Sequence, residues 1–232
     1  MDIKQFKYSK DNFGYLLFSG KEALAIDPGA VEDMMQFAFD KQIEIKMITN
    51  THLHQDHTLG NKAMLERTQG RFLDCSKIKS LETIFLNQDK IDVFPTPGHT
   101  LDSVCFSAKD FLVTGDTLFN GTVGNCFSGD LDAFFLSLKE LMAFPEDTRI
   151  YSGHDYVEES MTYARIIEKD NPFIDSYLKT YEPNHVVSRL KDEFKVNPYI
   201  RFNAPSIIGL LEQKEIFTSS ELERFKAVME LY

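Results

Sequence analysis

Three of the six histidines of this chain lie within one short stretch, Thr51 to His57, whose sequence THLHQDH also carries an aspartate. Buried side chains that carry charge or form hydrogen bonds need partners, and a folded chain rarely supplies so many of them in so small a volume. A metal ion would satisfy several of these side chains at once. The stretch therefore predicts a fold in which further ligands converge on this loop.

Short apolar strands alternate with helices around this loop. Residues 13–19 and 23–27 have the apolar character of buried strands, and a Pro-Gly pair ends the second one. Between 31 and 38, apolar residues recur at the spacing of one helix face. Residues 45–49 form a predicted strand that runs directly into THLHQDH. Functional side chains of α/β sheets collect beyond strand C-termini, which is where this loop lies.

Further strands are predicted at 90–94, 104–107, 111–114 and 149–152. A helix that begins near Asp130 and ends before Pro145 separates the last two strands. We interpret the aromatic stripe of this helix as core packing rather than as a cofactor site.

Three more candidate ligands follow predicted strands. His99, Asp116 and His154 each come directly after a glycine, which permits a sharp turn that presents the next side chain to a cleft. Loops at one edge of a sheet converge, so we expect all candidate ligands to surround one site. The candidates are His52, His54, Asp56, His57, His99, Asp116 and His154.

Five imidazoles and two carboxylates exceed the ligands of one tetrahedral ion, whereas two ions that share a bridging carboxylate and a bridging water would use them all. Each part alone has an ordinary explanation, either a surface His-x-His pair or a turn residue after a glycine. Together the seven residues predict a metal site. His185 lies in a polar stretch without such neighbours, and we predict that it lies on the surface.

The composition excludes several classes of protein. A formal net charge of −11 argues against broad nucleic-acid binding, because phosphates need clustered Lys and Arg. Cys75, Cys105 and Cys126 are odd in number and far apart, so we expect reduced thiols. The apolar runs are too short to cross a bilayer, and the first residues lack the hydrophobic core of a secretory signal. We therefore expect a cytoplasmic protein without a membrane partner.

The pattern becomes helical and polar from about Tyr156 onward, with several prolines that interrupt it. A Thr-Ser-Ser-Glu stretch resembles a capping box ahead of the last helix. We predict two domains, a metal-binding catalytic domain at 1–155 and a helical substrate-binding domain at 156–232.

Four motifs, in their order and separation, resemble the metallo-β-lactamase superfamily: THLHQDH, PTPGHT, TGDTLF and YSGHDY. Two later stretches, GHDYVEESMTYARIIEKDNPFI and LKDEFKVNPYIR, are similar to glyoxalase II, the hydroxyacylglutathione hydrolases. The resemblance covers about residues 10–201. It implies an α/β protein with an αββα sandwich and a helical substrate domain after it.

The resemblance also implies a role for each candidate ligand. One ion would be held by His52, His54 and His99, the other by Asp56, His57 and His154, and Asp116 would bridge them. Asp27 would accept a hydrogen bond that fixes the tautomer of a ligand histidine, although a turn before Pro28 explains this residue equally well.

The family's reaction converts S-D-lactoylglutathione into D-lactate and glutathione. The resemblance thus implies a thioester hydrolase with Asp56 and Asp116 as catalytic carboxylates. A water shared by two divalent cations would lose a proton near neutral pH and attack the polarised thioester carbonyl. Nitrogen and oxygen donors suit zinc, iron or manganese, and zinc is our default.

Substrate binding is expected to differ from the family pattern. Asn125 and Phe127 stand where the family usually carries a cation and a tyrosine, whereas Tyr156 matches a family tyrosine that contacts glutathione. Arg224 and Lys226 are two residues apart rather than three, a spacing that points them to different sides of a helix. We therefore predict weaker glutathione binding than in the family, or a different thioester or acyl substrate.

Two other functions stay open at this point. A persulfide dioxygenase would share these loops but use a single iron, and a metal-stabilised interaction module would have no activity. The seven intact ligands and the stretch EFKVNPYIR favour the hydrolase over both.

Overall fold

Two β-sheets form the centre of the computed structural model, which describes residues 1–231. The first sheet has the order β1-β2-β3-β4-β5, and its strands are β1 Asp2–Tyr8, β2 Asn12–Ser19, β3 Glu22–Ile26, β4 Glu44–Thr49 and β5 Arg71–Phe72. The second has the order β11-β10-β9-β8-β7-β6, and its strands are β6 Glu82–Leu86, β7 Asp89–Pro95, β8 Val104–Ala108, β9 Phe111–Gly115, β10 Arg149–Ser152 and β11 Ser188–Arg189.

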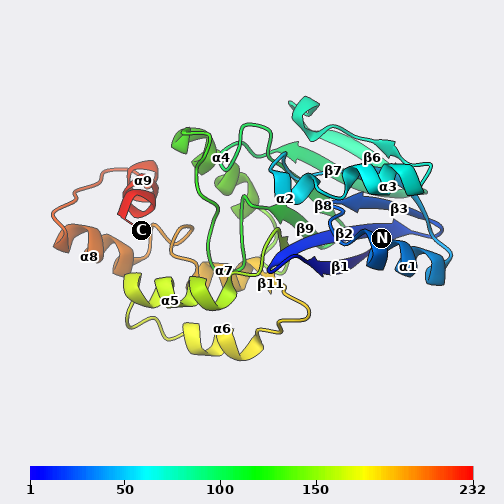
Figure 1. Ribbon diagram of the computed structural model, residues 1–232. Coiled ribbons are helices and arrows are strands. Elements are labelled where there is room, and N and C mark those ends of the chain that lie inside the picture. The colour runs from blue at the N-terminus through cyan, green and yellow to red at the C-terminus, as the bar shows by residue number, and fades with distance from the viewer. Residues whose placement is uncertain (232) are drawn as a thin grey trace.

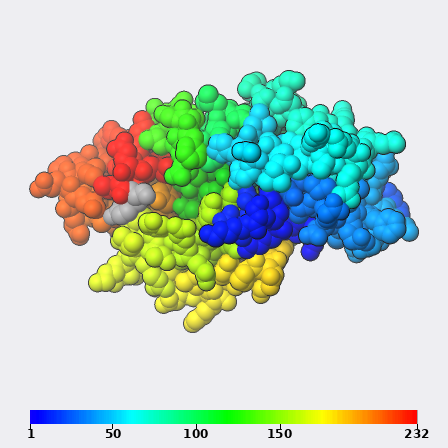
Figure 2. All heavy atoms as spheres, viewed as in Figure 1, coloured from blue at the N-terminus to red at the C-terminus, as the bar shows by residue number. Residues whose placement is uncertain are grey.

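Helices cover the outer face of each sheet (Figure 1). The helices are α1 Val31–Lys41, α2 Gln55–Thr58, α3 Asn61–Arg67, α4 Leu131–Met142, α5 Val157–Ile167, α6 Ile174–Thr180, α7 Leu190–Val196, α8 Pro205–Gln213 and α9 Glu221–Leu231, with a 3₁₀ turn at Cys75–Lys77. Figures 1 and 2 place α1 and α3 at one end of the molecule and α8 and α9 at the opposite end. The αββα layering expected from the sequence is confirmed.

Strand β2 shows why the layers pack as they do. Side chains alternate between the two faces of a strand, so Phe13, Tyr15 and Leu17 lie in the core between the sheets while Leu16 faces α1 and α3. Both faces are covered, and the strand therefore has an almost continuous apolar sequence.

The apolar stripe of α4 is core packing, as predicted. Phe134, Leu138 and Leu141 are fully buried in a cluster that also contains Leu112 of β9 and Phe225 of α9. The helix begins after Asp130, whose carboxylate accepts a hydrogen bond from the Ala133 N–H at 2.9 Å. Helix α4 therefore packs between the second sheet and the C-terminal helix α9.

The predicted strands are all present, but four others were missed. These are β1, in which polar and apolar residues alternate, and the strands β5, β6 and β11. Strand β11 pairs with β10, so the chain after residue 156 also adds a strand to the second sheet. The division at 155/156 therefore stays a prediction. His185 is exposed, as predicted, and no helix within residues 1–231 is long and apolar enough to cross a membrane.

Candidate metal centre

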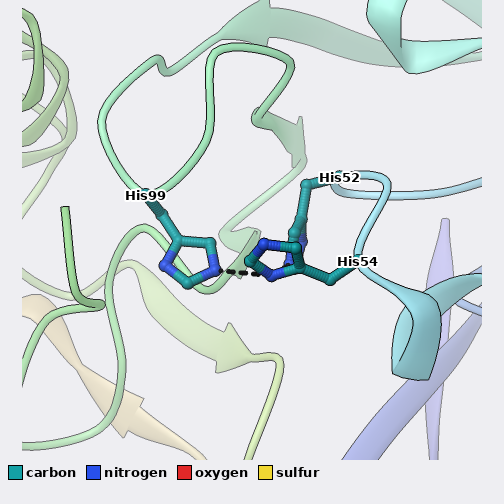
Figure 3. A group of neighbouring side chains, drawn as sticks. All are labelled: His52, His54 and His99. Atoms are coloured by element: carbon teal, nitrogen blue, oxygen red, sulfur yellow. Dashed lines mark hydrogen bonds between the residues drawn. The ribbon is translucent and has the colours of Figure 1, made fainter. Parts of the chain in front are cut away.

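Loops at the ends of β4, β7, β9 and β10 bring all seven candidate ligands together. Their ligand atoms form three overlapping groups, each within 4.8 Å: His52, His54 and His99; His52, His57 and Asp116; and Asp56, His57 and His154. Figure 3 shows the imidazoles of the first group pointing toward one another. The expected convergence of the ligands is present.

Hydrogen bonds on the outer nitrogens decide which way three of the imidazoles present their lone pairs. His57 Nδ1 lies 3.0 Å from Asp27 Oδ2, and His154 Nδ1 lies 3.0 Å from Asp11 Oδ1. His99 Nδ1 lies 2.9 Å from the Asn125 carbonyl oxygen. Carboxylate and carbonyl oxygens only accept, so in the neutral imidazole each Nδ1 carries the proton and each Nε2 is left with a lone pair.

His52 follows the same rule through Thr51. The Thr51 hydroxyl donates its one hydrogen to Asp27 Oδ2 at 2.7 Å. It can therefore only accept from His52 Nδ1, which lies 3.1 Å away. His52 Nε2 is left unprotonated as well, and Asp27 controls the tautomers of two histidines. The sequence left a simple turn role open for Asp27; its side chain is fully buried and bonded to the site.

The inward nitrogens face one another at distances that call for a cation. His57 Nε2 and His154 Nε2 are 3.2 Å apart, and His54 Nδ1 lies 3.0 Å from His52 Nε2 and 3.1 Å from His99 Nε2. The Nε2 lone pairs of neutral His57 and His154 repel at this distance of 3.2 Å unless a proton or a metal ion lies between them. A histidine that donates one ring N–H to a carboxylate or carbonyl oxygen and presents its other ring nitrogen to the ion is a common ligand of divalent metals in proteins. The residues therefore fit a metal centre.

Asp116 lies between the two halves of the ligand set. Its Oδ1 is 3.4 Å from His57 Nε2, and its Oδ2 is 3.4 Å from His154 Nε2 and 3.5 Å from His99 Nε2. Within residues 1–231 the buried Oδ1 has no hydrogen-bond donor. A buried carboxylate oxygen without a partner is costly, and a cation would remove that cost.

The charge of the site is set by burial and by its carboxylates. Burial, together with positive charge on His57, lowers the pKa of His52 to about 3, so this imidazole stays neutral. Burial also acts to lower the pKa of His57, but Asp27 and Asp116 outweigh it and raise that pKa well above its ordinary value. Burial favours a protonated Asp116, yet His57 and His154 hold the pKa of Asp116 well below its usual range. Asp116 therefore stays ionised, and a cation held by these residues would displace the proton from His57 Nε2.

Two glycines let the backbone close around Asp116. A Cβ atom at Gly124 would lie 2.0 Å from the Asp116 carbonyl oxygen, and one at Gly153 would lie 2.1 Å from Asp116 Oδ1. Neither position has room for a side chain, so the residue before His154 has to be a glycine for steric reasons.

A cleft of about 570 Å³ opens beside the metal-ligating groups. Asn125, Phe127 and Tyr156, the three predicted substrate residues, all line it. Asn125 also holds His99 through its carbonyl, and the Tyr156 ring stacks on His154 with centroids 4.9 Å apart. All three predicted substrate positions are therefore next to the metal ligands.

Several residues of the site were not predicted from the sequence. Asp11 bonds His154, and the Asn12 side-chain amide donates to Asp56 Oδ2 at 2.8 Å. Ser160 on α5 lines the cleft with a buried hydroxyl that has no hydrogen-bond partner among residues 1–231. Ser160 lies on α5, one turn after the N-cap residue Tyr156, and this spacing is visible in the sequence, whereas the Asp11-Asn12 pair is typical of an ordinary turn.

Comparison with known proteins agrees with this geometry. The profile described as "Metallo-beta-lactamase superfamily" matches residues 12–71 and 81–154, and "Hydroxyacylglutathione hydrolase C-terminus" matches 155–231. The hydroxyacylglutathione hydrolase of Nitrosococcus oceani is 35% identical, with 87% of this chain and 86% of that protein covered. The corresponding enzyme of Chromohalobacter salexigens is 30% identical, with 88% of each covered.

Solved structures share the fold at lower sequence identity. The crystal structure of ETHE1 from Myxococcus xanthus superposes with a TM-score of 0.72 at 22% identity, covering 99% of this chain and 90% of that chain. At this identity the match supports the fold alone.

Proposed function

Because the chain belongs to the metallo-β-lactamase superfamily and, within it, to the hydroxyacylglutathione hydrolases, we propose that it hydrolyses a hydroxyacyl thioester to a hydroxy acid and a thiol. S-D-lactoylglutathione is the reference substrate of this proposal. The observation that carries it is the set of four imidazoles whose Nδ1 atoms are hydrogen-bonded outward and whose Nε2 lone pairs turn inward.

The proposed ligands divide into two sets. His52, His54 and His99 would hold one divalent ion, Asp56, His57 and His154 the other, and Asp116 would serve both. Bound ions would lower the pKa of a water and polarise the thioester carbonyl. Zinc is the proposed metal, and iron and manganese suit the same donors.

The chain's own residues orient this chemistry. Asn12 donates to Asp56 Oδ2, the oxygen that lies 3.5 Å from His57 Nε2 and 3.3 Å from His154 Nε2, and thereby holds this oxygen toward the proposed ion site. Tyr8 donates to the Asp56 carbonyl oxygen at 3.0 Å and thereby holds the loop. The water oxygen forms a new bond to the acyl carbon, the C–S bond breaks, and the thiol leaves with a proton from that water.

Residues 156–232 are proposed to supply the substrate-binding side of the cleft. Tyr156, Ser160 and Tyr163 line it from α5 and the residue before it, and Tyr199 lines it from beyond α7. A cytoplasmic location, predicted from the sequence, is retained as part of the proposal.

The dioxygenase alternative has less support. The C-terminal family profile and the relatives at about 30% identity favour the hydrolase. A hydrolase of another acyl or ester substrate would use the same metal ligands and differ only in the cleft.

Thioester hydrolysis by the zinc-loaded protein tests the proposal. We expect loss of S-D-lactoylglutathione absorbance without oxygen uptake, and we expect His154→Ala to abolish it because the ring nitrogen of His154 faces the site. His185→Ala, an exposed histidine outside the site, is the matched control and should keep full activity. Oxygen uptake with a persulfide and no thioester loss would overturn the proposal.

A further inference from the structure

Outside the candidate metal ligands and the ions they would hold, the described lining of the cleft offers no positive charge to an anionic ligand. Among residues 1–231, no lysine or arginine lines it, and Glu159 is the one charged lining residue that is not a candidate metal ligand. Resting on the proposed thioester hydrolysis, we propose that this cleft selects a thiol carrier with an uncharged, amide-containing chain over anionic glutathione, and that Glu159 sets this selectivity.

Arg224 and Lys226, the two C-terminal cations considered for substrate binding in the sequence, have other partners. The Arg224 guanidinium donates to Asn203 Oδ1, and the Lys226 ammonium lies 2.7 Å from Asp132. Neither residue is part of the cleft lining. Glutathione carries two carboxylates and one ammonium at neutral pH, so its net charge would meet the carboxylate of Glu159 with no cation from the chain to offset it.

The polar groups that the cleft does offer are neutral. The Ser160 hydroxyl is buried and has no partner within residues 1–231, so a ligand group is its natural hydrogen-bond partner. The Tyr163 side chain, 46% exposed, lies on the same helix as Ser160. Hydroxyls of this kind both donate and accept, which matches the N–H and C=O groups of an amide chain.

Aromatic walls complete the cleft and favour an uncharged chain. The Phe127 ring is 66% exposed and lies edge-on to His54 and His99, with centroids 5.6 and 5.2 Å away. On the other side, Phe119 packs edge-on against Tyr156 at 5.1 Å. Apolar surface of this size is covered favourably by methylene and methyl groups, whereas a carboxylate placed against it would lose hydration without a partner.

Two thioesters that share one acyl group and differ in the thiol test which carrier the cleft prefers. S-D-lactoylpantetheine has an uncharged chain with two amides, and S-D-lactoylglutathione has a net negative charge. We expect the zinc-loaded protein to have a kcat/KM at least about tenfold higher for the pantetheine thioester than for the glutathione thioester. The difference should lie in KM rather than in kcat, because the reacting carbonyl is the same in both substrates.

Charge reversal at one helix position tests the role of Glu159. Glu159→Lys should raise the ratio of kcat/KM for S-D-lactoylglutathione to kcat/KM for the pantetheine thioester by roughly fivefold. Glu158→Lys makes the same change at an exposed neighbour that does not line the cleft, and it should alter neither substrate. Calorimetric binding of the free thiols to the same proteins gives a readout that is independent of turnover.

The outcomes distinguish the two proposals. The proposed selectivity would be overturned if the protein hydrolysed both thioesters and preferred that of glutathione. It would also be overturned if Glu159→Lys lost glutathione binding, because Glu159 would then bind the glutathione ammonium. In either case thioester hydrolysis would stand. Hydrolysis of neither thioester by the zinc-loaded protein would overturn the proposed function itself.

Discussion

Asp27→Asn should reverse the tautomer of a metal-ligating histidine without changing the size of the side chain. Asp27 Oδ1 accepts the Thr51 backbone N–H at 2.8 Å, and a backbone donor cannot reverse. The amide oxygen of the variant must therefore take this position, which places its NH₂ group at Oδ2, facing His57 Nδ1 and the Thr51 hydroxyl. His57 would then accept at Nδ1 and carry its proton on Nε2, toward the metal ligands.

The expected magnitude follows from the contacts that are lost. Removing a partner that orients a metal-bound histidine typically costs 10–100-fold in affinity, or about 1.4–2.7 kcal/mol. Two charge-assisted hydrogen bonds in a fully buried site are lost as well, which should lower the free energy of unfolding by roughly 2–4 kcal/mol.

Competition with a chromophoric zinc chelator measures the affinity, and urea unfolding measures the stability. Asp102→Asn is the matched control, because among residues 1–231 the Asp102 carboxylate accepts only the N–H of Leu53, in the loop of the metal ligands, at 2.9 Å, and an amide oxygen can replace it. An Asp27→Asn protein that binds zinc as tightly as the Asp102→Asn protein would refute the tautomer argument.

Three further changes have defined outcomes. Gly124→Ala should displace the Asp116 loop and reduce thioester turnover by roughly a hundredfold, measured at saturating zinc, because its Cβ would overlap the Asp116 carbonyl oxygen. Glu193 is fully buried and accepts hydrogen bonds from the Gly121 N–H and the Tyr177 hydroxyl, both at 2.7 Å; burial outweighs these bonds and raises its pKa. Its contribution to stability is therefore complete below the unfolded-state pKa of about 4.3 and is lost as the pH rises through the higher folded-state pKa. The free energy of unfolding of Glu193→Gln, measured by urea titration, should therefore fall less than that of the parent protein between roughly pH 5 and 7. An equal fall in the two proteins would contradict this. Chelator treatment should abolish turnover and lower the Tm, and added zinc should restore both, whereas a Tm indifferent to the metal would argue against a buried centre.

The metal ligands could be predicted because each has a local mark in the sequence. His99, Asp116 and His154 follow a strand and a glycine, and the other ligands share one stretch. The physical reason is steric, since the backbone passes so close to Asp116 that residue 153 has no room for a side chain. The metal ligands could therefore be predicted from local sequence patterns.

The supporting residues could not be predicted because their partners are distant along the chain. Asp11 and His154, whose side chains are hydrogen-bonded, are 143 positions apart, and nothing near Asp11 distinguishes it from a turn residue. Strand β1 was missed for a related reason. Its alternating pattern is typical of a half-covered strand, and only pairing with β2 decides that it forms one.

Stoichiometric metal titration of the metal-free protein, with metal content and S-D-lactoylpantetheine and S-D-lactoylglutathione turnover followed in the same samples, tests the central claim most directly. The proposed division of the ligands into His52, His54 and His99 for one ion and Asp56, His57 and His154 for the other, with Asp116 close to both sets, predicts that turnover rises until two ions are bound per chain. Full thioester turnover at one ion per chain, or binding of one ion only, would contradict the dinuclear centre.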